Sequence, residues 1–404
     1  MANSVGAGRY KTMNQPSHPF LGLLLLGSLS FPAMSAELDS RAMEALLVKS
    51  MNSVGSNRLA AALNEVDALL KANPNFKLAQ MLKGDLLMAR AKPLSGFGND
   101  PDGPSDRVND LRDEARARLL RVQQQTVTSA PRFIWQLDPQ QRYAIVVDTS
   151  KSTLYLYEND NGTPRYVENF YISVGKKGSD KLSEGDQKTP LGVYFINAHL
   201  DKKQLTDFYG SGAYPINYPN EWDNRQGRNG HGIWLHGTPS DTYSRPPLAS
   251  NGCVVLSNDD LVHLGKSVQV GTTPVIITNR MELRDDNDQA EHTALLKQIE
   301  QWRSDWSSLN TDAYLNHYAS DFATGNFKLD SWSAQKRLVN SGKSWIKVGV
   351  SAVSIFPYPN QPKLVVVNFE QDYASNNLVN RMKKRQYWMK LDNRWQIVYE
   401  GAAS

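Results

Sequence analysis

Hydrophobic residues between positions 38 and 126 recur at three- and four-residue intervals, the spacing that gathers them on one side of a helix. Leucines and a valine follow it from 59 to 70, Asn73-Pro74-Asn75 interrupts it, and it resumes over 78–91. Since this interruption ends a helix, the stretch predicts a helical hairpin. A loop rich in Gly, Pro and Asp follows over 94–105, and 110–125 predict one more helix. We call residues 37–130 the helical region.

At Arg142 the pattern changes to the alternation of β-strands. Residues 143–148 and 153–157 predict two strands joined by a turn. Further strands are predicted at 166–174, 192–197, 231–236 and 273–278, with Gly- and Asp-rich connections. Turns this frequent indicate a central β-rich domain over residues 138–280.

A charged segment, 281–288, precedes a third region of helices and then strands. The helices are predicted at 293–309, 311–321 and 331–341, and the strands at 346–356, 363–374, 381–391 and 395–399. This order predicts an α+β domain over 290–401, with helices on one side of an antiparallel sheet. Six of the nine tryptophans lie here, at 302, 306, 332, 345, 388 and 395. They indicate either a packed core or an aromatic-lined pocket. The fold class is therefore multidomain α+β.

The first 36 residues have the pattern of a secretory signal peptide. Arg9 and Lys11 precede an apolar run over 20–31, and small residues follow it. The run is shorter than the roughly 20 apolar residues that a spanning helix needs, which favours cleavage near Ser35 or Ala36 over an uncleaved anchor. No later stretch is apolar for long enough to span a bilayer, so we expect a periplasmic protein without a membrane span.

Removal of the signal peptide takes away two cations and no acid, so the net charge falls from +4 to +2. This balance argues against nucleic acid as a partner. The remaining 368 residues (404 less 36) suggest two or three domains. The single cysteine, Cys253, cannot form an internal disulfide. A free thiol in an oxidising compartment calls for a chemical reason.

Cys253 stands seventeen residues after His236. A thiol with a pKa of about 8.5 is mostly protonated at neutral pH, so a base must activate it as a nucleophile. His236 is the nearest candidate, because an imidazole can accept the thiol proton and return a proton to a leaving amine. Gly252 permits a tight backbone turn, so the amides of Asn251, Gly252 and Cys253 could form an oxyanion hole.

Less specific interpretations of these residues are a buried inert cysteine and a structural histidine. A zinc site is a third, and its ligands would be His231, His236, Cys253 and His263. A five-residue spacing on a strand points the first two imidazoles to opposite faces, which argues against zinc. We predict neither a metal nor a cofactor.

The chain resembles the L,D-transpeptidase (YkuD) catalytic domain of bacterial cell-wall enzymes. The family pattern of His-Gly, a loop of about fifteen residues and Ser/Thr-x-Gly-Cys is met by His236-Gly237 and Ser250-Asn251-Gly252-Cys253. Other matching segments are 154–157, 185–194 and 271–277, in the expected order.

This resemblance implies that Cys253 is the nucleophile, that His236 is the base and that the main-chain carbonyl of Gly237 orients the imidazole. The implied substrate is the peptidoglycan stem tetrapeptide. Cys253 would attack the carbonyl of the third residue, expel the terminal D-alanine and leave a thioester. A neighbouring stem amine would resolve the thioester into a 3-3 cross-link, or water would hydrolyse it.

Two positions depart from the family pattern. Many members have His at the position of Asn251, and many have Arg or Asn at the position of Val255. Another group would then have to bind the substrate carboxylate. The candidates are Arg228, Arg245, Lys188 and Ser250, and the alternative for each cation is a solvated loop charge.

Residues 290–401 resemble the cone-shaped nuclear-transport-factor-2-like (NTF2-like) fold by element order. Together with the central domain, this is similar to L,D-carboxypeptidases that trim stem peptides. The sequence thus leaves open a transpeptidase, a carboxypeptidase, release of a wall-linked lipoprotein and, in another class, a non-catalytic wall-binding scaffold. The expected partners are stem peptides, with cell-wall proteins as further candidates for the helical and C-terminal regions.

Overall fold

The computed structural model describes residues 38–93, 96–98, 104–123 and 129–403. The predicted signal peptide lies outside these residues. None of the helices in this described part has the length and apolar character that crossing a bilayer requires.

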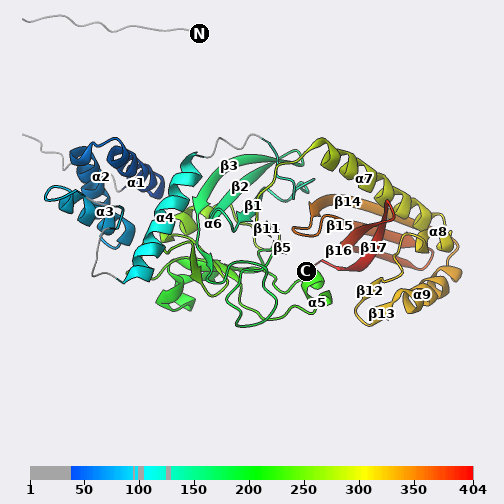
Figure 1. The fold of residues 1–404 in the computed structure, drawn as a ribbon. Helices are drawn as coiled ribbons and strands as arrows, with labels where there is room; N and C mark the ends of the chain where they lie inside the picture. Colours follow the sequence, from blue (N-terminus) through cyan, green and yellow to red (C-terminus); the bar gives the residue numbers. More distant parts are fainter. Residues whose placement is uncertain (1–37, 94–95, 99–103, 124–128, 404) are drawn as a thin grey trace, which may run out of the picture. The chain divides into compact units, whose positions relative to one another are not determined.

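The helical region contains α1 (Ser40–Gly55), α2 (Leu59–Ala72), α3 (Lys77–Met88) and α4 (Ser105–Gln123) (Figure 1). Asp39 caps the start of α1 by accepting a hydrogen bond from the amide of Ala42. The predicted hairpin corresponds to α2 and α3, and α4 begins five residues earlier than expected. The apolar faces of α1–α3 form one core, which also takes in Tyr243 from far along the chain.

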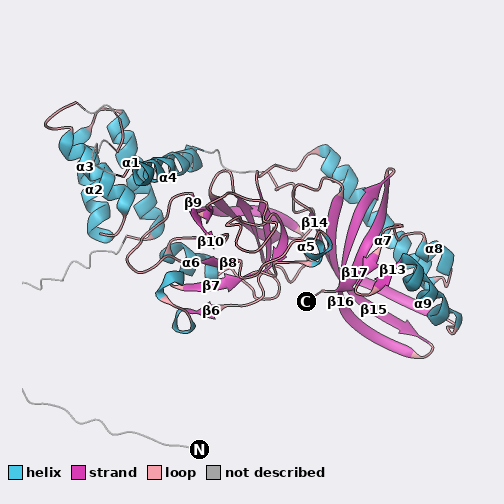
Figure 2. Ribbon diagram, turned by 60° about the horizontal axis from the view of Figure 1, so that its bottom comes forward, coloured by secondary structure: helices cyan, strands magenta, loops and turns pink. Residues whose placement is uncertain are grey.

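The central region contains two main sheets. The strands of the five-stranded sheet, in the order β3-β2-β1-β11-β5, are Thr163–Tyr171, Thr153–Asp160, Tyr143–Asp148, Pro274–Thr278 and Gly192–Phe195. The strands of the four-stranded sheet, in the order β10-β8-β7-β6, are Val254–Val255, Trp234–His236, Gly212–Pro215 and Leu200–Asp201 (Figure 2). β4 (Val174–Gly175) pairs with β9 (Leu248–Ser250). Two 3-10 turns (Lys202–Gln204 and Asp207–Tyr209) and the helices α5 (Glu221–Arg225) and α6 (Asn258–Gly265) complete the region.

The five-stranded sheet is buried on both faces. Ile145 and Val147 of β1 join a core with residues of β7, β8 and β10, whereas Ala144 and Val146 join a core with strands of the third region. Successive side chains of a strand point to opposite faces, so one strand serves both cores. This double burial explains why β1 is continuously apolar from Ala144 to Val147 rather than alternating.

The third region consists of a four-stranded meander with helices packed along it (Figure 1). Its strands are β14 (Ile346–Pro357), β15 (Leu364–Ser375), β16 (Leu378–Leu391) and β17 (Arg394–Ala402). Its helices are α7 (Asp286–Ser307), α8 (Thr311–Leu315) and α9 (Leu329–Ser341), and β12 (Ala323–Thr324) and β13 (Phe327–Lys328) form a hairpin. The predicted α+β fold class, with helices followed by an antiparallel meander, is confirmed.

Five of the six tryptophans in this region are buried in one aromatic core: Trp302, Trp306, Trp332, Trp388 and Trp395. Trp345 differs, with 47% of its surface exposed. The interpretation of the tryptophans as core residues is therefore correct for these five.

Acid is expected to destabilise the third region through Glu400. This buried carboxylate accepts hydrogen bonds from Lys384, Gln386 and Tyr318. Burial acts to raise the pKa of Glu400, but Lys384 and Lys336 outweigh it and lower the pKa from 4.5 to about 2. A lowered folded-state pKa gives stability that is complete above the unfolded-state pKa and is lost as the pH falls toward the folded-state value. We expect the free energy of unfolding to fall by about 3 kcal/mol between these two pKa values.

Urea denaturation followed by tryptophan fluorescence measures this loss. Glu400→Gln is expected to be less stable at pH 7 but to lose much less stability over the same acid range. An equal acid-induced loss in the variant would assign the effect to another group.

Candidate active site

Two short parallel strands bring the segments that carry His236 and Cys253 side by side. β10 pairs with β8 so that Val255 lies opposite His236 and Val254 lies opposite Leu235. Paired residues on parallel strands point to the same face, and so do residues two apart on one strand. Cys253 lies in the loop directly before β10, with its Sγ 3.4 Å from the carbonyl oxygen of Gly232. Tyr209, whose ring packs against the imidazole, also interacts electrostatically with Cys253, so the thiol and His236 share one neighbourhood.

The main chain fixes the orientation of His236. Its Nδ1 lies 2.7 Å from the carbonyl oxygen of Gly237, and a carbonyl only accepts, so Nδ1 carries the proton. The other nitrogen, Nε2, is then an acceptor. The rings of Tyr209 and Phe208 pack against the imidazole, with centroids 5.1 and 5.8 Å away. Gly237 thus makes the contact that the family resemblance implies.

Asn258 braces the turn after His236, and the sequence analysis missed this role. Its Oδ1 accepts a hydrogen bond from the Ser211 amide at 2.7 Å, and its Nδ2 donates to the Thr238 carbonyl at 2.8 Å. A Cβ at Gly237 would clash with that Oδ1, so a side chain does not fit there. In the structure Ser257, directly before Asn258, caps α6 by accepting a hydrogen bond from the Asp260 amide.

The loop before Cys253 is held by its own hydrogen bonds. Gly252 has φ +125°, and a Cβ there would lie 2.7 Å from the carbonyl oxygen of Lys188. Ser250 is buried, and its Oγ donates to the Cys253 carbonyl at 2.6 Å and accepts from the Gly252 amide at 3.0 Å. The predicted substrate-binding side chain of Ser250 therefore holds the loop. The Gly252 amide is already engaged, so of the predicted oxyanion donors we carry forward Asn251 and Cys253.

Thr189, which the sequence analysis did not select, connects this loop to a neighbouring segment. Its Oγ1 donates to the Gly252 carbonyl at 3.0 Å and accepts from the Gly175 amide at 2.9 Å. Segment 185–194, which matches the family pattern, thus connects the loop before Cys253 to Gly175 through Thr189.

Burial keeps both reactive groups uncharged at neutral pH. Burial raises the pKa of the Cys253 thiol, and a hydrogen bond from the Trp234 main chain and the charges of Arg245 and Lys181 offset only part of the increase. Burial also lowers the pKa of His236 to about 4; the Gly237 carbonyl opposes this shift and the Arg245 charge adds to it. The pair is therefore a neutral thiol and a neutral imidazole, not a thiolate and an imidazolium.

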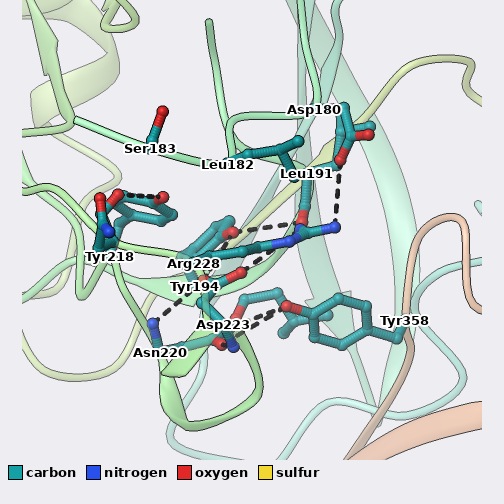
Figure 3. A network of polar contacts seen from close by, with 12 residues as sticks. Asp180, Leu182, Ser183, Leu191, Tyr194, Tyr218, Asn220, Asp223, Arg228 and Tyr358 are labelled. Carbon is teal, nitrogen blue, oxygen red and sulfur yellow. Dashed lines mark hydrogen bonds and ion pairs between the residues drawn. The ribbon is translucent and has the colours of Figure 1, made fainter. Parts of the chain in front are cut away.

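The guanidinium of Arg228 forms ion pairs with two carboxylates (Figure 3). Its Nη2 donates to Asp180 Oδ1 at 3.1 Å, and its Nη1 lies 3.5 Å from Oδ1 of the buried Asp223. Asp223 Oδ2 also accepts from the Tyr194 hydroxyl at 3.1 Å, and burial raises its pKa to about 6. These contacts assign Arg228 to a structural network rather than to a solvated loop.

Tyr358 of the C-terminal region joins the same network. Its hydroxyl accepts a hydrogen bond from Asn220 Nδ2 at 3.1 Å, next to Asp223 in α5. On the other side of α5, Glu221 accepts from the buried Arg385 at 2.9 Å. The short helix therefore connects the central region to the third region.

Of the predicted cations, Arg245 is the one whose charge acts on Cys253. Lys188 is half-buried, and its main chain packs against Gly252. Lys181, which the sequence analysis missed, also acts on Cys253, and its Nζ pairs with Asp186 at 2.8 Å. No pattern in the sequence distinguishes Lys181 from other loop lysines.

Val255 occupies the position where many family members have a polar residue. It is buried opposite His236, and its amide and carbonyl each pair with Ser173 at 2.9 Å. The valine therefore supports the imidazole with an apolar contact surface.

In the described part of the chain, no group of three or more His, Cys, Asp and Glu side chains is arranged to hold a metal ion. His263, a member of the zinc alternative, instead contacts Glu168, with Nε2 2.9 Å from Oε1.

Comparison with known proteins identifies two domains. Residues 142–277 match the family model of the L,D-transpeptidase catalytic domain. The central domain is an L,D-transpeptidase (YkuD) domain. Residues 294–401 match the model of the Cds6 C-terminal NTF2-like domain. Both resemblances drawn from the sequence are therefore confirmed.

Individual relatives agree with this assignment. YqjB of Bacillus subtilis, named provisionally as an L,D-transpeptidase, is 28% identical over 173 residues, which are 41% of this chain and 88% of that protein. The structure of Bd1075 from Bdellovibrio bacteriovorus is 28% identical with a TM-score of 0.60, over 68% of this chain and 98% of that chain. Pgp2, the helical cell shape determining protein of Campylobacter jejuni, is 26% identical with a TM-score of 0.58, over 68% of this chain and 96% of that chain.

Proposed function

We propose that the protein is a periplasmic peptidoglycan enzyme that cleaves stem tetrapeptides through a thioester on Cys253. The observation that carries this proposal is the pairing of β10, which directly follows Cys253, with β8, which ends at His236, with His236 Nδ1 fixed by Gly237, inside a YkuD domain.

The chemistry begins with a neutral pair. His236 Nε2 takes the thiol proton as Cys253 Sγ bonds to the carbonyl carbon of the third stem residue. The amides of Asn251 and Cys253 would stabilise the oxyanion that forms. The bond to the terminal D-alanine then breaks, and His236 returns the proton to the leaving amine. An acceptor next attacks the thioester, gives its proton to His236 and releases the thiol.

The first candidate acceptor is the side-chain amine of a neighbouring stem, which makes the protein an L,D-transpeptidase that forms 3-3 cross-links or attaches another amine. The second is water, which makes it an L,D-carboxypeptidase that leaves tripeptides. The joint match of the YkuD and NTF2-like domains to the cell-shape protein Pgp2 favours a role in cell shape for either reaction.

Incubation of the mature protein with purified tetrapeptide muropeptides, followed by mass spectrometry, tests the proposal. Cross-linked dimers support transpeptidation, and tripeptide monomers alone support hydrolysis. If neither product forms, and Cys253→Ala leaves wall composition unchanged in cells, the non-catalytic scaffold becomes the better explanation. Cell fractionation and the mass of the mature N-terminus test the proposed periplasmic location and cleavage near Ser35 or Ala36.

The alkylation rate of Cys253 is expected to rise continuously with pH. The thiol pKa is raised by burial and the His236 pKa is lowered to about 4, so no thiolate–imidazolium pair forms at intermediate pH. His236 therefore stays neutral, and available as a base, until the pH falls to about 4. Stopped-time labelling with iodoacetamide between pH 5 and pH 10 (roughly the range that brackets His and Cys titration) measures the profile. A plateau of high reactivity near pH 6 would instead show a preformed ion pair.

A further inference from the structure

We propose that the helical region is a working part of the active site, because it fixes residues 238–247 and so holds the Arg245 guanidinium beside Cys253. We call residues 238–247 the Arg245 loop. The inference deepens the proposed function by assigning a positioning role to a region that neither family model includes.

Tyr243 anchors the Arg245 loop in the helical region. It is 6% exposed and belongs to the core of α1–α3 rather than to a core of the central domain. Its ring lies 4.5 Å from that of Phe76, between centroids, at the turn that joins α2 to α3. The loop is thus held by an apolar anchor two positions before Arg245, since only Ser244 separates Tyr243 from Arg245.

A buried carboxylate holds the residue between them. Ser244 Oγ donates to Glu114 Oε1 of α4 at 2.6 Å, and Glu114 is 1% exposed. Arg118, one helical turn later, pairs with Glu114 at 3.0 Å and also contacts Glu44 of α1. The charge of the carboxylate is therefore balanced inside the helical region, which makes Glu114 a fixed acceptor for the loop.

Arg245 itself is tied to the same cluster through its main chain. Its carbonyl accepts a hydrogen bond from the Tyr171 hydroxyl at 2.9 Å, and the guanidinium of Arg118 lies 4.0 Å above the Tyr171 ring. The helical region thus holds Tyr243 and Ser244 directly, and it contacts Arg245 indirectly, through Arg118 of α4 on the Tyr171 ring of β3.

The side chain of Arg245 points to the catalytic pair. Its guanidinium lies 4.8 Å over the ring of Phe208, and that ring packs against His236. Among the described residues no carboxylate forms an ion pair with Arg245, so its charge is available to a thiolate or a substrate carboxylate. Other groups that face Cys253 include Lys181, which is paired with Asp186, Tyr209, the main chain of Trp234 and the carbonyl of Gly232, which accepts from Sγ at 3.4 Å.

Two alkylating reagents of similar size measure the position of this charge. Iodoacetate is anionic and iodoacetamide is neutral. The rate of Cys253 alkylation by iodoacetate divided by the rate with iodoacetamide therefore reports the positive charge near the thiol. Arg245→Gln is expected to lower the ratio about three- to tenfold, the size of one unit charge acting through a partly solvated path. Ser244→Ala and Tyr243→Ala, in the full mature chain, are expected to lower it in the same direction because they release the loop.

Val66→Ala is the matched control. Val66 is buried in the same helical core, and its aliphatic side chain can provide neither the ring contact nor the hydrogen bonds that hold the Arg245 loop, so the substitution weakens the core while those interactions stay in place. A drop in the ratio for Tyr243→Ala and Ser244→Ala but not for Val66→Ala supports the proposal. It is overturned if both loop variants keep the normal ratio while Arg245→Gln lowers it, or if Arg245→Gln has no effect. The labelling needs no turnover, so these outcomes are independent of whether muropeptides are cleaved.

Discussion

Replacement of Cys253 by alanine is expected to abolish release of D-alanine from stem tetrapeptides, lowering kcat/KM by at least about 10⁴-fold. The sulfur of Cys253 is the atom that bonds to the acyl carbon. In the alanine variant His236 can still activate water, but no thioester can form. Product analysis by liquid chromatography and mass spectrometry measures the loss. Trapping of a covalent acyl adduct on the unmodified protein, absent in the variant, identifies the intermediate.

His263→Ala is the control variant, because it removes a histidine that is not part of the proposed catalytic pair and leaves the thiol in place. His263 lies on α6 against Glu168, away from the β8–β10 face, so activity is expected to change little. Cys253→Ala should keep the melting temperature of the parent protein, because Cys253 lies in a loop and contributes no large side chain to a core. Full activity in the Cys253→Ala variant would disprove the thioester mechanism.

Replacement of Arg118 by methionine is expected to lower the free energy of unfolding of the helical region by about 3–5 kcal/mol. Arg118 is 3% exposed and pairs with Glu114 and Glu44. Without it the Glu114 carboxylate stays buried with Ser244 as its remaining donor. Hydrogen exchange of α4 amides, with and without urea, measures the loss in this region separately from the other domains.

A double variant separates the ion pair from simple packing. Arg118→Met with Glu114→Gln leaves a neutral amide in place of the uncompensated charge, so it is expected to recover a large part of the lost stability. If the double variant is as unstable as Arg118→Met, the lost packing of Arg118 on Tyr171 accounts for the effect instead.

Local patterns were enough to predict most of the regular structure. The strands β14–β17 and the helices α2, α3 and α9 lie within a few residues of their predicted positions, because each has a clear period in its own sequence. Helix α7 begins seven residues before its predicted start, since Asp285 caps it within the segment that the sequence analysis treated as a charged linker. Acidic residues are common both in the first turn of a helix and in a charged linker, so the sequence alone does not distinguish the two.

Residue types and spacing were enough to select Cys253 and His236 as a candidate catalytic pair, and the catalytic role of the pair stays a prediction. The surroundings of the pair were not predictable from the sequence. Arg228 and Arg245 are both arginines in glycine- or proline-containing loops, yet the first is paired with Asp180 and Asp223 while the second acts on Cys253. The difference depends on which side chains the folded chain brings beside each guanidinium; Asp180 lies 48 positions from Arg228, and no local pattern in the sequence records that contact.

The sequence by itself determined the division of the chain into a helical region, a β-rich domain and an α+β domain. It also determined the choice of Cys253 and His236 as the candidate pair. Both depend on residue type and short-range spacing. The tertiary structure decided what surrounds them. It buried both faces of the five-stranded sheet, placed the apolar Val255 opposite His236 and brought Tyr243 into the helical region. Each of these depends on contacts between segments far apart in the chain, where burial and hydrogen bonding, rather than local periodicity, select the neighbour.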